Sequence, residues 1–266
     1  MRIGFYKMHG AGNDFIVVDA RMLGDAWATP ERVADLNARR LGIGAEGLIL
    51  LLPSRDFDFR MRFFNPDGGE AALCGNGARC IARLAHALGV APGNMRFETA
   101  AGPLAAEIIE GGAALVMPPI RDRQGPHLFT KASLALEAYA LRVGVPHLVV
   151  RVPEVRAVDV AALGRWLREA PQFAPEGINV NFVSSRQGEA WDIRTYERGV
   201  EAESGACGTG AVAAAAVLHE HYQAADTLAL HTRDGFVLSV ALGHPHGPRL
   251  AGPAVEVFRG EICVPQ

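Results

Sequence analysis

The sequence predicts an α+β fold in which two similar halves arose by internal duplication. The first observation is a repeated motif, because Cys74 and Cys207 each stand directly before a Gly-x-Gly triplet and an alanine-rich segment with helical character. The second is their spacing, since 207 − 74 = 133 positions is half of the 266-residue chain. The third is that the expected strands and helices follow the same order twice. These observations predict a duplicated fold with domains at 1–117 and 118–266. The prediction allows the last strand to pack against the first half.

The elements of the first half follow from hydrophobic periodicity and from turn residues. Prolines after residue 117 end its last strand, and Thr29 is expected to cap the first helix. Strict alternation at 57–63 is typical of a half-buried strand. The predicted helices are 30–41 and 78–89. The predicted strands are 3–8, 15–20, 48–52, 57–63, 95–99, 104–109 and 113–117.

The second half repeats this order of strand pair, helix, two strands, cysteine helix and hairpin. Its predicted helices are 160–170 and 211–222. Its predicted strands are 135–143, 147–152, 178–184, 190–196, 227–231 and 235–242, with Cys263 in a last strand. Two equivalent domains are expected to face each other across a cleft, with one cysteine on each side.

Composition excludes several classes of function. The chain is 49% hydrophobic and 21% charged, which is enough to bury a sizeable core. A net charge of −3 and a pI near 6.3 provide no basic surface for nucleic acid. No apolar segment has the length of a membrane span and no signal peptide begins the chain, so we expect a cytoplasmic protein with no membrane partner.

The cysteines point to chemistry rather than to crosslinks or metal binding. Four cysteines in a chain of this size form no disulfide framework, and their spacing fits no zinc site, so we expect reduced thiols and no metal. Cys80 and Cys263 are expected to be packing residues. A cysteine at a helix N-terminus meets backbone N–H groups and the positive end of the helix dipole, which favour the thiolate. Cys74 and Cys207 are therefore candidate acid/base groups, each beside a potential anion site.

Two thiols on opposite sides of one small molecule suit the inversion of a stereocentre. One thiolate removes a proton from one face while the other thiol delivers a proton to the opposite face. Helix-terminal N–H donors would stabilise the negative charge that develops beside a carboxylate. The sequence thus favours racemisation or epimerisation of an amino acid without any cofactor. A thiol redox sensor is the alternative from another class, but it leaves the glycine and asparagine residues around each cysteine unexplained.

A set of motifs, in order along the chain, resembles the diaminopimelate epimerase family. The motifs are His9-Gly-x-Gly-Asn13-Asp-Phe15, Gly42-Ile-Gly44, Asn65-Pro-Asp-Gly68, Cys74-Gly-Asn-Gly-x-Arg-Cys80, Pro146-His147, Asn179, Glu197-Arg-Gly199 and Ala206-Cys-Gly-Thr-Gly210. The resemblance implies two pseudo-symmetric domains, each a β-barrel-like sheet around a central helix. It also implies interconversion of LL- and meso-2,6-diaminopimelate in lysine and peptidoglycan biosynthesis, independent of pyridoxal phosphate.

The resemblance also assigns roles to individual residues. Cys74 and Cys207 become the acid/base pair, and His147 and Glu197 lie near them and tune them. Arg198 would bind the distal carboxylate of the substrate and Glu197 its distal ammonium. The implied substrate-binding set is Asn13, Asn65, Gly75, Asn76, Gly77, Asn179, Glu197, Arg198, Gly208 and Thr209. The implied partner is a small-molecule amino acid, and a homodimer is left open.

The sequence departs from the family pattern at three places. Val145 stands where many members carry an asparagine, Gly47 stands where some have glutamine, and residues 203–205 differ from the usual Glu-Thr pattern. None of these positions is a cysteine. Proline and hydroxyproline racemases are a second alternative, because they share the two-cysteine logic but have no use for the charged pair Glu197-Arg198.

Overall fold

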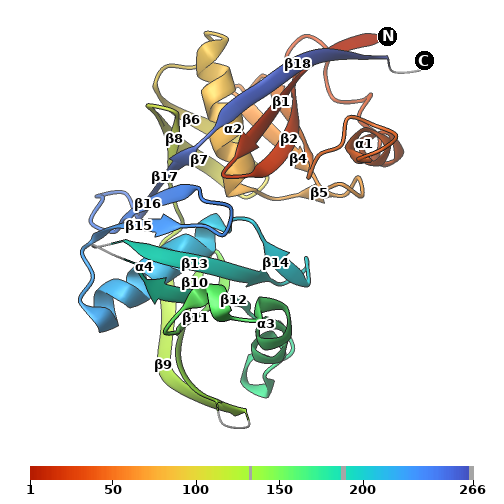
Figure 1. Cartoon of the computed structure of the whole chain (residues 1–266). Helices are drawn as coiled ribbons and strands as arrows, with labels where there is room; N and C mark the ends of the chain where they lie inside the picture. Colours follow the sequence, from red (N-terminus) through yellow and green to blue (C-terminus); the bar gives the residue numbers. More distant parts are fainter. Residues whose placement is uncertain (132–133, 187–189, 264–266) are drawn as a thin grey trace. The chain divides into compact units, whose positions relative to one another are not determined.

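A computed structural model describes residues 1–131, 134–186 and 190–263 (Figure 1). The chain divides into two compact units, one formed by Met1–Leu115 with Gly252–Gln266 and the other by Val116–Ala251. The predicted division lies close to the first boundary, at residue 117. It counted the C-terminal segment with the second half but allowed its last strand to pack on the first half, and the segment groups with unit 1.

Unit 1 is a curved sheet around the helix α2 (Gly75–Ala87), which packs against β1, β2, β3, β4 and β7. In order across the sheet its strands are β18 (Val255–Cys263), β1 (Arg2–Gly10), β2 (Asn13–Asp19), β3 (Leu48–Leu52), β4 (Arg60–Phe64), β6 (Asn94–Thr99), β7 (Gly102–Ile109) and β8 (Gly112–Val116). The pairs β2–β3 and β4–β6 are parallel and the others are antiparallel. The short β5 (Glu70–Ala71) pairs with β4. The helix α1 (Pro30–Asn37) contributes Val33 to a hydrophobic core that it shares with residues of the sheet.

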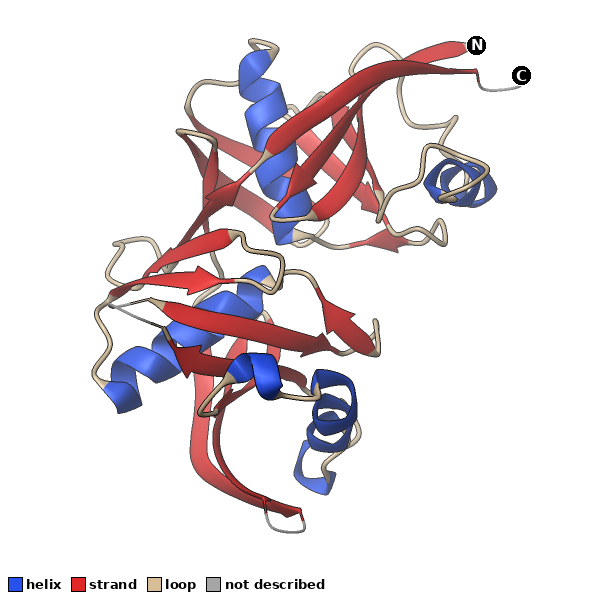
Figure 2. Ribbon diagram, viewed as in Figure 1, coloured by secondary structure: helices blue, strands red, loops and turns tan. Residues whose placement is uncertain are grey.

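Unit 2 repeats this arrangement around α4 (Gly208–Tyr222), which packs against β10, β11, β12, β15 and β16 (Figure 2). Its strands in order are β9 (Ile120–Lys131), β10 (Leu134–Val143), β11 (Val145–Arg151), β12 (Asn179–Ser185), β13 (Trp191–Glu197), β15 (Thr227–His231), β16 (Val237–Ala241) and β17 (Arg249–Pro253). Here β11–β12 and β13–β15 are the parallel pairs. The remaining elements are β14 (Ala202–Ser204), α3 (Val160–Arg168) and two short 3-10 turns at Val155–Ala157 and Pro171–Phe173.

The two units are copies of one pattern, which confirms the predicted fold class. Residues 2–10 and 135–143 show the same succession of buried, half-buried and exposed side chains. Their offset, 135 − 2 = 133, equals the spacing of the two cysteines. The strand β18 lies beside β1 as β9 lies beside β10, so the C-terminal strand completes the first unit.

The central helix of unit 2, α4, fits inside a curved sheet because most of its buried side chains are small. All residues of α4 from Gly210 to Leu218 are buried, and most of them are alanine. Strands can approach such a helix from several sides, which is the environment expected for a helix that is apolar all round. Within the described residues, each helix is too short or too polar to form a membrane span.

Some elements differ from the sequence prediction for identifiable reasons. The strand β9 was not predicted, because only Phe129 of its side chains is buried and its polar sequence shows no alternation. The short strands β5, β14 and β17 were also missed. The helix α1 ends at Asn37, because the chain then folds back so closely that a Cβ atom at Gly42 would overlap the carbonyl oxygen of Asp35. The strand β4 starts at Arg60 rather than at 57, since Asp58 instead accepts a hydrogen bond from the Arg96 N–H group.

Candidate functional site

Cys74 is the N-cap residue of α2, as the motif predicts. Its backbone is extended, and the first bond of the helix ladder runs from Ala78 N to its carbonyl oxygen over 2.8 Å. The N–H groups of Gly75, Asn76 and Gly77 therefore lie outside this ladder, at the positive end of the helix dipole. The sulfur, which is half-buried, sits at a helix terminus that favours negative charge.

A chain of hydrogen bonds fixes the side chains around Cys74. Asn13 donates its amide nitrogen to the carboxylate of Glu46, so its Oδ1 atom is directed inward. That oxygen accepts from Cys74 Sγ at 3.6 Å and from Asn76 Nδ2 at 3.3 Å. The amide of Asn76 is fixed in turn, because its Oδ1 accepts from Arg79 Nη2 at 2.7 Å and a guanidinium can only donate. The predicted residues Asn13, Cys74 and Asn76 thus form one connected group.

Arg79 is a fully buried cation that the prediction did not assign. Its Nε donates to the Pro253 carbonyl at 3.4 Å, and its Nη1 has no hydrogen-bond partner in the described part of the chain. Burial lowers the pKa of Arg79, while the negative charge of the Cys80 and Cys74 thiolates opposes that shift. Burial also raises the pKa of the Cys80 thiol to about 12, which fits its expected role as a packing residue.

Cys207 is the N-cap residue of α4, and its side chain is buried. Its Sγ lies 3.6 Å from the Thr209 hydroxyl, which can donate or accept. The glycines of the motif allow close packing of the first turn. A Cβ atom at Gly208 would lie 2.8 Å from Leu250, and one at Gly210 would overlap Asn181 Oδ1 and lie 3.2 Å from Cys207 Sγ. The first turn of α4 therefore rests directly on the Asn181 amide.

His147 on β11 and Asn181 on β12 form a buried pair beneath that turn. Both side chains are completely inaccessible, and Asn181 Nδ2 lies 3.2 Å from His147 Nδ1 and 3.1 Å from the Leu148 carbonyl. Thr195 on β13 donates to Asn181 Oδ1 at 3.0 Å. Burial lowers the pKa of His147 to about 3, and the positive charge of Arg198 acts in the same direction.

Asn179 and Arg198 meet at the end of β13. The Arg198 N–H group donates to Asn179 Oδ1 at 2.8 Å, and Arg198 Nη1 lies 3.1 Å from Glu176 Oε1. Hydrogen bonds first from Arg142 and then from Arg198 hold the pKa of Glu176 below its ordinary value. Asn179 also lies beside His147 in the parallel register of β11 and β12. Glu197 is the last residue of β13, next to Arg198.

Not every predicted site residue joins these groups. Asn65 forms backbone hydrogen bonds in the turn before β5, and within the described residues its side chain shows no bond to the other predicted site residues. Val145 begins β11 as Asn13 begins β2, so the acceptor that faces Cys74 has no counterpart at that position in unit 2.

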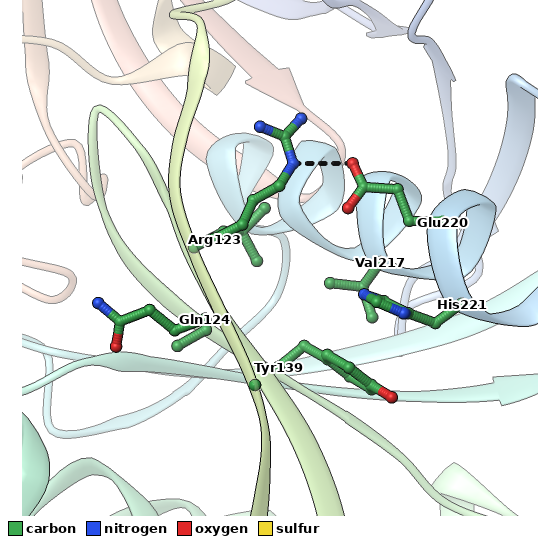
Figure 3. A pocket seen from close by; sticks show the side chains of 9 residues that line it. Arg123, Gln124, Tyr139, Val217, Glu220 and His221 are labelled. Atoms are coloured by element: carbon green, nitrogen blue, oxygen red, sulfur yellow. Dashed lines mark hydrogen bonds and ion pairs between the residues drawn. The ribbon is translucent and has the colours of Figure 1, made fainter.

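A shallow pocket of unit 2 lies between β9, β10 and the C-terminal half of α4, whereas Cys207 caps the N-terminus of that helix (Figure 3). Arg123 Nε donates to Glu220 Oε1 at 2.8 Å across it, and the rings of Tyr139 and His221 stack with their centroids 3.8 Å apart. The residues that line this pocket are outside the predicted site. The pocket contains no cysteine, so it is not a candidate for the chemistry that the cysteines indicate.

The sequence did not lead to a role for two buried polar residues, Arg79 and Asn181. A signal existed for both of them. Arg79 is a charge within an otherwise apolar helix turn, and Asn181 is an amide in the middle of a wholly buried stretch of β12. Buried polar groups of this kind are retained when they have specific partners, and here the partners are site residues.

Comparison with known proteins identifies the family. The family model described as diaminopimelate epimerase matches residues 5–118 and 139–246. The diaminopimelate epimerase of Methanocella arvoryzae is 40% identical over 285 aligned positions, covering 99% of this chain and 98% of the relative. That of Aquifex aeolicus is 37% identical over 272 positions, covering 97% of each chain. The chain belongs to the diaminopimelate epimerase family.

Solved structures outside the diaminopimelate epimerase family share its fold. A hydroxyproline epimerase from Agrobacterium vitis aligns with a TM-score of 0.69 at 20% identity, covering 98% of this chain and 92% of the other. A PhzF-family phenazine biosynthesis protein from Enterococcus faecalis aligns with a TM-score of 0.75 at 20% identity, covering 99% and 100%. At this identity the likeness shows the fold alone. The racemase alternative is thus a structural relative, whereas the diaminopimelate epimerase relatives match in sequence along nearly the whole chain.

Proposed function

We propose that this protein interconverts LL- and meso-2,6-diaminopimelate, with Cys74 and Cys207 as the two acid/base groups and with no cofactor. The observation that carries the proposal is that both cysteines of a diaminopimelate epimerase family member are N-cap residues of the central helices of their units. Membership in the family supports the substrate, and the helix termini support the chemistry.

In the proposed reaction one cysteine acts as thiolate and the other as thiol. The thiolate takes the proton from the α-carbon, so an S–H bond forms as the C–H bond breaks and leaves its electron pair on carbon. The second thiol then gives its proton to the opposite face of that carbon and becomes the thiolate. The enzyme ends with the two protonation states exchanged, and reversal requires only the same two steps in the other direction.

The surroundings of Cys74 suit a group that must both give and take a proton. The helix terminus and the buried Arg79 favour the thiolate, whereas the inward carbonyl oxygen of Asn13 favours the thiol, because it accepts a hydrogen bond from S–H. Neither form is stabilised alone. The N–H groups of Gly75 to Gly77 and of Gly208 and Thr209 are proposed to hold the α-carboxylate and the charge that develops beside it.

Recognition of the distal amino-acid centre is assigned to Arg198 and Glu197, supported by Asn179, Asn65 and Asn13. A guanidinium binds a carboxylate through two parallel hydrogen bonds, and the link from Arg198 N to Asn179 fixes its backbone. The proposed product, meso-2,6-diaminopimelate, supplies lysine and peptidoglycan synthesis. The proposed location is the cytoplasm, which keeps thiols in the reduced form that the reaction needs.

The test is turnover of LL-2,6-diaminopimelate by the purified protein with no cofactor added. Arg198→Ala should reduce kcat/KM by about 10²-fold or more, because it removes a charge-assisted contact from a closed site. Lys131→Ala, which removes a cation that lies over Trp166, is the matched control. Equal rates on proline would assign the protein to another racemase.

A further inference from the structure

The buried amide of Asn181 has a fixed orientation. Its nitrogen must face the Leu148 carbonyl at 3.1 Å, because that oxygen can only accept. Its Oδ1 faces the Thr195 hydroxyl at 3.0 Å, and a rotated amide would place two acceptors together at Leu148. The Nδ2 atom therefore donates at both of its short contacts.

The second short contact is His147 Nδ1, at 3.2 Å. A ring nitrogen that faces an N–H donor must present its lone pair, so the proton of the neutral imidazole is on Nε2. That Nε2 atom is fully buried and has no hydrogen-bond partner in the described part of the chain. A buried N–H donor without an acceptor costs about 1–3 kcal/mol of folding free energy. We therefore expect that an acceptor for this N–H group is supplied during the reaction.

We propose that Asn181 is a positioning residue that holds His147 as a neutral Nε2–H donor, so that His147 serves the Cys207 half of the site as a hydrogen-bond donor and never as a base. The proposal rests on the proposed function only for the identity of the acceptor, an anionic group formed or bound beside Cys207. Asn181 links His147 to the turn that Cys207 caps: its Nδ2 contacts His147 Nδ1, and a Cβ atom at Gly210 would overlap its Oδ1 and lie 3.2 Å from Cys207 Sγ.

The electrostatic surroundings of His147 also favour its neutral form. Complete burial disfavours the imidazolium, and Arg198 adds a like charge. Thr195 and Asn179, which lie beside this pair, are uncharged, and the paired strands β11 and β12 are apolar on either side of it. An imidazolium would also place its Nδ1–H group against the Asn181 N–H group.

The direct test is the tautomer of His147 in the intact protein, measured by long-range ¹H–¹⁵N NMR and assigned with His147→Gln. The expected spectrum is that of the Nε2–H form, unchanged from pH 8 to pH 5. Asn181→Asp replaces the donor by an acceptor and should place a proton on Nδ1. Thr195→Val, which leaves both Nδ2 contacts intact, should keep the Nε2–H form. An Nδ1–H tautomer or an imidazolium in the wild-type protein at pH 7 would overturn the proposal, and this readout requires no turnover.

Kinetics separate a donor from a base. Glutamine offers an N–H donor but accepts no proton at neutral pH, so His147→Gln should lose about tenfold in kcat, the equivalent of one hydrogen bond. His147→Leu should lose substantially more. A general base contributes about 10² to 10⁴-fold, and a loss of that size in His147→Gln, equal to the loss in His147→Leu, would contradict the donor role.

Discussion

The two cysteines of this protein differ in the groups that face them, although their helices correspond. Cys74 faces an amide oxygen that Glu46 fixes through Asn13, and an acceptor of this kind stabilises the protonated thiol. Cys207 faces the Thr209 hydroxyl, which can stabilise either form. One source of the difference is that Val145 begins β11 where Asn13 begins β2. A second is that Asn76 stands two residues after Cys74, whereas Thr209 stands two residues after Cys207.

The buried His147 should make stability depend on pH in a defined window. The unfolded chain binds a proton at this ring below about pH 6.5, whereas the folded chain resists protonation down to about pH 3. Stability from this group is therefore complete above 6.5 and is lost as the pH falls toward 3, by up to about 1.4 kcal/mol per pH unit. His147→Gln should flatten the fall in the free energy of unfolding between pH 6 and 4.5. The same substitution at the exposed His246 is the control, and an equal effect of both would contradict this account.

At the scale of elements, the first turn of α4 depends on two glycines that leave no room for a side chain. Gly210→Ala would drive a methyl group into Asn181 Oδ1 and toward Cys207 Sγ. Overpacking of this kind costs about 1–3 kcal/mol. Gly93→Ala is the control, because a Cβ atom there meets nothing within 4 Å. Thermal unfolding should show a lower Tm for Gly210→Ala alone, and a wild-type Tm would mean that the turn does not rest on Asn181.

The elements that carry a hydrophobic pattern could be predicted from the sequence, and those that are held by their neighbours could not. The alternation in β1 and the apolar run in β3 determine their burial directly. The strand β9 has no such pattern and is a strand because β10 pairs with it. The cysteine helices could be predicted because each begins with a Cys-Gly-x-Gly sequence and continues as an alanine-rich segment.

The site could be predicted as far as local motifs reach. The start of α2 contains Cys74, Asn76 and Arg79 within six positions of the chain. Because they are neighbours in sequence, the motif alone predicts that they lie close together in space. The pair His147 and Asn181 is separated by 34 residues and meets through the parallel register of β11 and β12. Sequence alone does not supply this register, and the role of Asn181 could therefore be seen only in the structure.

At the scale of the whole molecule, the chain returns to its first unit at the end. The strand β18 pairs with β1 from Arg2 to His9, and Ile262 is part of the unit 1 core. Unit 2 needs no such return, because β9 precedes β10 directly in the chain. The first copy is thus completed by the last strand of the chain, and the second by the strand directly before its own first hairpin.

The C-terminal strand should therefore stabilise unit 1 selectively. Ile262 is 8% exposed, and replacing it with alanine should cost about 2–5 kcal/mol. Hydrogen exchange measured by mass spectrometry should accelerate in β1 and β2 and remain slow in β11 and β12. Val257→Ala on the same strand removes a side chain that is 57% exposed and should change little. Equal acceleration in both units would show that they unfold as one.

The most direct test of the central claim, that Cys74 and Cys207 serve opposite faces of one α-carbon, is turnover of LL-2,6-diaminopimelate in deuterium oxide, stopped early. With two thiols the product receives a proton that has exchanged with solvent, so deuterium should appear at the inverted centre while the remaining substrate stays largely unlabelled. Cys74→Ala and Cys207→Ala should each abolish inversion yet favour opposite diastereomers in residual exchange, and Cys263→Ala should behave as wild type. Early label in both substrate and product of the wild-type enzyme, or near wild-type epimerisation by either of the first two variants, would contradict the account.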